Sequence, residues 1–218
     1  MNRILNRLAV LTATGATVLA VVRWPRMATW GATPVEAEGP IAGDELVPGA
    51  KYRTTHAVTV HSAVEAVWPW LVQMGQGRGG LYSYDWLENL FGLHMHSADR
   101  VVPELQHLEV GDVVRMVPEG TEPDLSFTAL RVEPPRLLVL GSTESREDVL
   151  ASGMPYPVWT FELRRLDKDA TRLVVRFQSD FAPTVVGWLM NKYALEPVHC
   201  AMERRMLLGI KERAERAA

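Results

Sequence analysis

The sequence predicts an α+β fold in which a long C-terminal helix covers the apolar face of an antiparallel sheet. Side chains alternate in polarity through residues 54–60, which is the period of a half-buried strand. Runs at 158–166 and 171–178 alternate in the same way around a polar turn and indicate a hairpin. Apolar side chains at helical spacing follow near the C-terminus, and their stripe matches the apolar face that such a sheet must cover.

The first predicted strand leads directly into a helix. Val64, Val67 and Leu71 recur at helical spacing, and we expect Pro69 to kink this helix because its ring lacks the backbone donor. A second short helix fits residues 84–91, with Ser83 as its N-cap.

Further strands are predicted at 112–117, 126–132 and 137–141, before the hairpin. Within the hairpin one face is apolar. The other face carries charged side chains that we expect to meet water, which favours an antiparallel sheet. These charged residues are Glu162, Arg164, Arg172 and Arg176.

The C-terminal segment is predicted to be helical, with Pro197 separating a short piece from a longer one. Its apolar stripe consists of Trp188, Leu195, His199, Met202, Met206 and Ile210. The only cysteine, Cys200, lies within this segment and fits a buried, inert thiol.

Composition excludes several classes of protein. The chain has 218 residues, 47% of them hydrophobic, and a net charge of -3 without a basic stripe. We therefore expect a packed domain and no nucleic-acid partner.

The N-terminal part differs from the rest. Residues 1–26 contain an uncharged apolar run, 8–22, flanked by arginines, which predicts a single-pass anchor in the cell membrane. A cleaved secretory signal or a helix lying on the membrane surface is the alternative, and the similar arginine content of the two flanks leaves the orientation open. Residues 27–51 are rich in Pro, Gly and acids and predict an extended linker, followed by the folded domain at 52–218.

Several motifs of this domain carry a resemblance to a known family. They are the threonine-rich strand at 54–60, the W-L-V-Q-M-G run at 70–75, the G-L-Y-S-Y-D-W-L-E-N run at 80–89, and the helix containing 202–207. From Tyr52 onward the chain resembles the START-like superfamily, also called SRPBCC or polyketide cyclase/dehydrase-like proteins, and within it a membrane-associated bacterial subgroup of unknown activity. The resemblance implies a helix-grip fold, in which the sheet curves around the C-terminal helix, and brings no catalytic residue set. His56 stands where that subgroup usually carries Arg, which argues against carrying over a charge pair at this position.

Other motifs are better explained as structure than as chemistry. Gly75, Gly77 and Gly80 match G-x-G-x-x-G, but they follow a helix and no repeated strand-helix units come after them. A flexible connection, with Arg78 solvated or paired with an acid, is the simpler interpretation. His94 and His96 lack supporting ligands, so the sequence predicts neither a metal nor a cofactor. We interpret His56 and His199 as core histidines.

Methionines and aromatic residues from several predicted elements would surround the space between the sheet and the C-terminal helix. Such a lining suits a hydrophobic small molecule or lipid. The candidate ligand-binding residues are Met74, Arg78, Tyr82, Tyr84, Asp85, Trp86, Trp159, Phe177, Trp188, His199, Met202 and Met206. The predicted function is a membrane-tethered binding domain, with Arg78, Tyr82 and Tyr84 near the opening.

Two alternatives remain open at this stage. One is a cyclase or dehydratase that acts on an apolar substrate through Asp85, Tyr84 or His199. The other is an interaction module whose core is filled by its own side chains.

Overall fold

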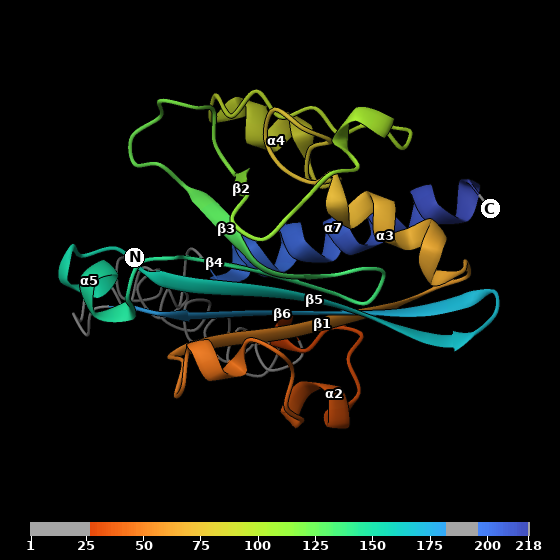
Figure 1. Ribbon diagram of the computed structural model, residues 1–218, viewed down its shortest axis with the longest axis horizontal. Helices are drawn as coiled ribbons and strands as arrows, with labels where there is room; N and C mark the ends of the chain where they lie inside the picture. The colour runs from red at the N-terminus through yellow and green to blue at the C-terminus, as the bar shows by residue number, and fades with distance from the viewer. Residues whose placement is uncertain (1–26, 182–195, 218) are drawn as a thin grey trace, which may run out of the picture.

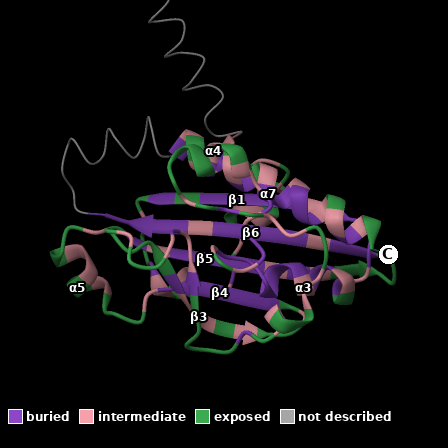
Figure 2. Ribbon diagram, turned by 90° about the horizontal axis from the view of Figure 1, so that it is seen from above, coloured by how far each residue is buried: buried purple, intermediate pink, exposed green. Residues whose placement is uncertain are grey.

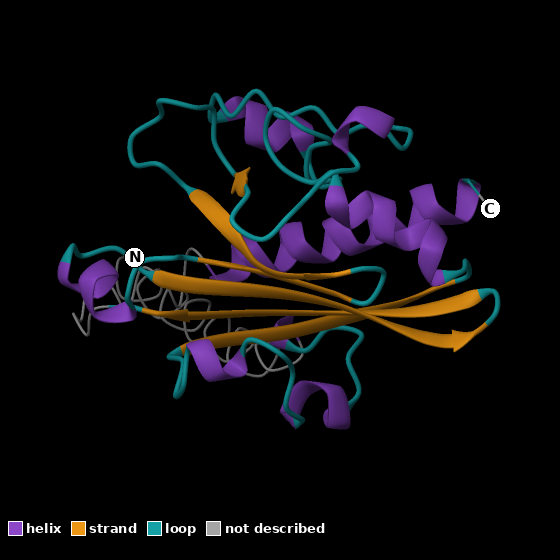
Figure 3. Ribbon diagram, in the orientation of Figure 1, coloured by secondary structure: helices purple, strands orange, loops and turns teal. Residues whose placement is uncertain are grey.

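The computed structural model describes residues 27–181 and 196–217. Its centre is a six-stranded antiparallel sheet with the order β1-β6-β5-β4-β3-β2 (Figure 3). The strands are β1 (Tyr52–Val60), β2 (Val113–Arg115), β3 (Ser126–Glu133), β4 (Leu137–Gly141), β5 (Tyr156–Asp167) and β6 (Ala170–Asp180). Every strand expected from the alternating pattern is present, and β5 and β6 form the predicted hairpin.

Helices lie on both sides of this sheet, with α3 and α7 on one side and α2 on the other (Figure 1). The helices are α2 (Pro34–Glu38), α3 (Val64–Val72), α4 (Asp85–Leu90), α5 (Arg146–Ala151) and α7 (Glu196–Arg216). Two short 3-10 turns, η1 (Asp44–Leu46) and η2 (Pro103–Leu105), complete the described elements. The α+β class and the antiparallel sheet gripping a C-terminal helix agree with the sequence.

The main core lies between the sheet and the pair α3 and α7. Phe161 and Leu173 from the hairpin pack in one cluster with Leu207 and Ile210 of α7. All four side chains are inaccessible to solvent, and Figure 2 shows the central strands buried along most of their length. This burial of apolar surface is the main stabilisation of the layer arrangement.

One close contact ties α7 to the segment that precedes α4. A Cβ placed on Gly209 would lie 2.2 Å from the carbonyl oxygen of Tyr82. Tyr82 itself has a φ of 57°, and its hydroxyl donates to the carbonyl of Trp70 over 3.0 Å. Only glycine permits this approach of backbone to helix, so residue 209 fixes where the segment crosses α7.

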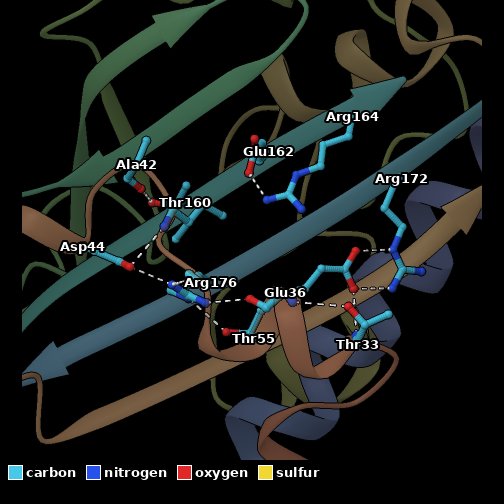
Figure 4. A network of polar contacts seen from close by, with 12 residues as sticks. Thr33, Glu36, Ala42, Asp44, Thr55, Thr160, Glu162, Arg164, Arg172 and Arg176 are labelled. Atoms are coloured by element: carbon cyan, nitrogen blue, oxygen red, sulfur yellow. Dashed lines mark hydrogen bonds and ion pairs between the residues drawn. The ribbon is translucent and has the colours of Figure 1, made fainter. Parts of the chain in front are cut away.

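The outer face of the sheet differs from the sequence prediction, because the segment 27–51 packs against it instead of forming an extended linker. The Arg176 guanidinium, which was expected in water, has no exposed surface. It donates to the backbone carbonyls of Glu36, Ala37 and Gly39 over 2.8–2.9 Å and to the Asp44 carboxylate over 2.7 Å (Figure 4).

A second arginine of β6 holds the same segment. Arg172 donates to both carboxylate oxygens of Glu36 over 2.8 Å, and these bonds are the main reason that the pKa of Glu36 falls to about 2. Thr33 and Glu36 form a capping box at the start of α2, with Pro34 in its first turn. Helix capping and ion pairs therefore hold segment 27–51 in place, although its apolar residues recur at neither helical nor strand spacing.

Several local expectations need correction. Tyr84 is the N-cap residue of α4 and makes no side-chain cap. The Ser83 hydroxyl instead donates to the carbonyl of Met202 on α7, over 3.2 Å. Helix α5 was not predicted. Pro69 lies inside α3, as expected, and the kink expected there stays a prediction.

The predicted membrane anchor, 1–26, and the short helical piece before Pro197 lie outside the described residues. Within residues 27–181 and 196–217 no helix has both the length and the apolar character needed to span a bilayer. Within the described residues, α7 runs from Glu196 through Pro197 to Arg216.

Candidate functional site: an apolar cavity beside α7

A cavity of about 510 Å³ lies between α7, the sheet and the segment that carries α4. Met202 and Met206 of α7 form one wall, and Met95 and Met116 reach it from loops on the opposite side. Leu125 and Val198 belong to the wall and are 44% and 52% exposed, so the cavity opens to solvent beside them. Its size and lining are those of a small-molecule site.

Aromatic rings from three strands form the floor of this cavity. The ring centroids of Trp159 and Phe177 lie 6.2 Å apart at 81°, and those of Phe127 and Trp159 lie 5.9 Å apart. The imidazole of His199 packs on Phe177 with a centroid distance of 4.3 Å. These contacts fix the rings at favourable geometries and make the floor rigid.

One carboxylate stands among these rings. Glu203 of α7 lines the cavity and is 2% exposed. Trp159 Nε1 donates to Glu203 Oε1 over 2.7 Å, and Thr54 Oγ1 donates to Oε2 over 3.3 Å. His199 Nε2 lies 3.5 Å from Oε1. The carboxylate is therefore well supplied with donors despite its burial.

His56 on the edge strand β1 is the ionic partner of Glu203. Its Nδ1 lies 2.5 Å from Glu203 Oε2, and its Nε2 lies 2.7 Å from the carbonyl oxygen of Met27. The carboxylate beside Nδ1 forms an ion pair with the ring, and the carbonyl beside Nε2 can only accept a hydrogen bond, so this environment favours the charged imidazolium. The structure thus contains a charge pair at the position where the departure from the resembled subgroup had argued against one.

The pKa values of this pair follow from its geometry. Burial alone would raise the pKa of Glu203, but the adjacent His199 and His56 hold it well below its ordinary value. Burial also disfavours the His56 imidazolium, yet contacts with Cys200 and with the Glu203 carboxylate raise the pKa of His56 to about 10. Glu203 is therefore ionised and His56 charged at neutral pH.

A second carboxyl group, Glu88 of α4, lines the same cavity in a different environment. The residue is 2% exposed, and neither carboxyl oxygen has a hydrogen-bond partner among the described residues. Burial, with a smaller contribution from the nearby Asp85 carboxylate, raises the pKa of Glu88 to about 7. Two carboxyl groups of one cavity thus have pKa values shifted in opposite directions.

The residues predicted for the site fall into three groups. Those that line the cavity are Trp159, Phe177, His199, Met202 and Met206. Those that lie elsewhere among the described residues are Met74, Arg78, Tyr82, Tyr84, Asp85 and Trp86. Trp188 lies outside the described residues.

The second group has other roles. Met74 is buried in the main core, and Tyr82 is held there by its bond to Trp70. The Asp85 carboxylate accepts from the backbone and hydroxyl of Ser97. Tyr84 and Trp86 are exposed, at 36% and 69%. The interpretation that placed these side chains at the ligand site is not supported by their positions.

The glycine-rich turn has a structural explanation. Gly75 and Gly80 exchange two backbone hydrogen bonds of 3.0 Å, which closes a tight hairpin around Arg78. The Arg78 guanidinium donates to the carbonyls of Val72 and Leu105 over 3.1 Å. Arg78 therefore anchors backbone near α3 and does not line the cavity.

Neither carboxyl group was among the residues that the sequence assigned to the site. Glu203 follows Met202 and lies one helical turn from His199, so it is a charged residue in the middle of an otherwise apolar stripe. That position was a usable signal, because a charge on a core-facing stripe requires a buried partner. Glu88 gave no comparable signal, since acids in a short exposed helix are common.

Comparison with known proteins gives a likeness of fold. No protein-family model matches the chain, and no curated protein does. An aromatase/cyclase from Streptomyces sp. R1128 is 19% identical over 76% of this chain and 94% of its own, with a TM-score of 0.46. Truncated norcoclaurine synthase from Thalictrum flavum is 14% identical over 72% of this chain and 92% of its own, with a TM-score of 0.41.

A conserved protein from Geobacillus kaustophilus is 13% identical over 76% of this chain and 97% of its own, with a TM-score of 0.46. Similarity at this level concerns architecture alone and assigns no ligand or reaction. The observed sheet order and the covering α7 are consistent with the helix-grip fold that the sequence predicts. Within that architecture, the molecule is a helix-grip domain with an apolar cavity beside its C-terminal helix.

Proposed function

We propose that this protein binds a hydrophobic small molecule or lipid in the cavity between the sheet and α7. The observation that carries the proposal is the cavity itself, about 510 Å³ in volume and lined mainly by methionine, aromatic and aliphatic side chains. Methionine side chains adapt to ligands of varied shape, whereas the ring cluster around Trp159 gives a fixed floor. The filled-core interaction module expected as an alternative is not favoured, because its interior would leave no such space.

A pair of tryptophan substitutions on α7 tests this proposal. Met202→Trp adds bulk at the cavity wall, whereas Leu208→Trp adds similar bulk on the same helix outside the lining. Calorimetric titration with decanol should show saturable one-to-one binding to the wild-type chain and to Leu208→Trp, and at least about tenfold weaker binding to Met202→Trp. Equal affinity in all three proteins would place decanol elsewhere and refute the proposal.

We also propose that residues 1–26 tether this binding domain to the cell membrane. The support is the composition of the sequence, an uncharged apolar run with arginines on both sides. Membrane fractionation of the full chain and of a chain starting at residue 27 is the test. Recovery of both in the soluble fraction would contradict the tether without affecting the proposal for the cavity.

A second candidate function is proton transfer on an apolar substrate, favoured by the opposite pKa shifts of Glu88 and Glu203. Such a pair is the usual arrangement of a general acid and a general base. The candidate predicts accelerated exchange of the α-hydrogens of 2-tetralone for solvent deuterium, followed by NMR, with loss of the acceleration in Glu88→Gln. Exchange that is no faster than in buffer alone would rule out this second candidate function. Asp85 and Tyr84, expected in this role from the sequence, lie outside the cavity lining.

A further inference from the structure

Glu88 is the one cavity-lining carboxyl group whose oxygens have no partner among the described residues. Glu203 is bonded to Trp159 and Thr54 and paired with His56. Glu88, equally buried, has neither a donor nor a cation at hydrogen-bond distance within residues 27–181 and 196–217. A buried polar group without a hydrogen-bond partner destabilises a protein, and a charged one does so more strongly. Such a group calls for an explanation, and a bound ligand that supplies the missing donor is one.

The charges around the cavity restrict the chemistry of that ligand. Among the described residues that line it, the titratable side chains are Glu88, Glu203 and His199, with no Lys or Arg. Asp85, one turn before Glu88 on α4, adds a further negative charge that acts on it. An anionic head group would meet these carboxylates, and no Lys or Arg of the described lining would bind it. A cationic head group would meet an unpaired carboxylate.

The aromatic floor and the aliphatic side chains suit the apolar body of such a ligand. Phe127, Trp159 and Phe177 line the cavity and contact one another through their rings. Most of the other described lining residues are aliphatic or methionine and offer further apolar surface.

We infer that the cavity takes an apolar amine, with its ammonium group donating to Glu88 and its hydrocarbon body against the methionines and aromatic rings. This inference rests on the proposed function and names the chemical class of its ligand. The burial of Glu88 supports it, because an ammonium group would supply a counter-ion that the described residues do not.

Three ligands with the same ten-carbon chain test this inference: decylamine, decanol and decanoic acid. Calorimetric titration of the full chain, below the concentrations at which these compounds form micelles, should give the order decylamine, then decanol, then decanoate. Glu88→Gln keeps the size of the side chain and removes its charge. This substitution should weaken the binding of decylamine about tenfold and change the affinity for decanol by less than about twofold. Glu104→Gln, a matched loss of charge at an exposed position outside the cavity, should change neither affinity.

The pH dependence provides a second readout. The pKa of Glu88 is about 7, so the affinity of the wild-type chain for decylamine should rise from about pH 6 to about pH 8, where the amine stays protonated. Glu88→Gln retains His199, Glu203 and Asp85, and any dependence that persists in it belongs to those groups. If Glu88→Gln shows the same pH dependence of decylamine affinity as the wild-type chain, the ammonium group does not bind to Glu88 and the inference is wrong.

The remaining outcomes separate the two proposals. If decanol binds and decylamine has no advantage, or if Glu88→Gln leaves decylamine unchanged, the amine inference is wrong and the cavity still binds apolar molecules. If decanoate binds best, the inference is also wrong. If none of the three compounds binds, the proposed function itself fails.

Discussion

His56 Nδ1 and Glu203 Oε2 lie 2.5 Å apart, with both side chains fully shielded from solvent, and this ion pair joins the edge strand β1 to the centre of α7. The two residues are distant in sequence and meet at one end of the aromatic floor, where Trp159 shares the Glu203 carboxylate. The pair therefore links the packing of the C-terminal helix to the wall of the cavity. Breaking it should affect the whole domain.

Glu203→Gln tests this linkage. The substitution preserves shape but leaves the His56 imidazolium buried without a counter-ion, which should reduce the free energy of unfolding by about 3–5 kcal/mol. The control is Glu212→Gln on the same helix, since the Glu212 side chain is 54% exposed and pairs with Arg205. We expect the control to change stability by less than about 1 kcal/mol. Urea denaturation measures the stability of both variants. If Glu203→Gln unfolds at the same urea concentration as the wild-type chain, the ion pair contributes little to stability.

The pH dependence of stability should report on His56. The pKa of His56 rises from 6.5 to about 10 on folding. The stabilisation is therefore complete below pH 6.5 and is lost as the pH rises toward 10, where the folded protein releases the proton. Denaturation measured across this interval should show a decline in the wild-type chain that is reduced in His56→Gln. If the wild-type chain and His56→Gln lose stability in parallel as the pH rises, the decline belongs to groups other than His56.

The packing of segment 27–51 against the sheet should depend on Arg176. Arg176→Gln removes donors from three backbone carbonyls and from the Asp44 carboxylate. We expect a loss of about 3 kcal/mol or more, because these acceptors remain in place without their partner. Hydrogen exchange of the amides at 36–44 should also accelerate.

Arg164→Gln is the matched control on the same face, since its side chain is 39% exposed and pairs with Glu162 alone among the described residues. Its effect should stay below about 1 kcal/mol. Similar small losses in both variants would mean that the arginine contacts do not hold the segment.

Gly209→Ala separates helix propensity from packing. Alanine favours a helix interior by about 1 kcal/mol over glycine. Here, however, the added Cβ would lie 2.2 Å from the Tyr82 carbonyl oxygen, so we expect the variant to be about 1–3 kcal/mol less stable. Ala201→Gly, at an exposed position of the same helix, gives the reference value for propensity alone. A more stable Gly209→Ala would show that the Tyr82 segment can move away from α7.

The sheet and the long helix could be predicted because their signals are periodic. Trp159, Phe161 and Leu163 alternate along one face, and the structure places that face in the main core. The segment 27–51 has no such period. It is held by arginine side chains that donate to backbone carbonyls, and backbone acceptors leave no trace in a sequence. The prediction of an extended linker with a water-facing sheet failed for this reason.

The site was predictable only in part. Residues such as Met206 and Phe177 were identified because apolar patterning places them between helix and sheet, and both line the cavity. Residues of the dense run around Tyr82 and Trp86 were assigned to the site as well, but Tyr82 packs in the core and Trp86 is exposed, since large aromatic residues occur in either environment. Glu88 became significant only with the structure, because burial without a partner is a property of three-dimensional packing.

Methyl NMR of the methionines tests the central claim most directly. In a chain labelled at the methionine methyl groups, titration with decanol should shift Met95, Met116, Met202 and Met206 saturably, because these four line the cavity. Met74, buried in the core, and Met154, on a different surface, should stay unchanged and serve as internal controls. Absence of a saturable shift in the four cavity methionines, or equal shifts in all six, would contradict binding in this cavity.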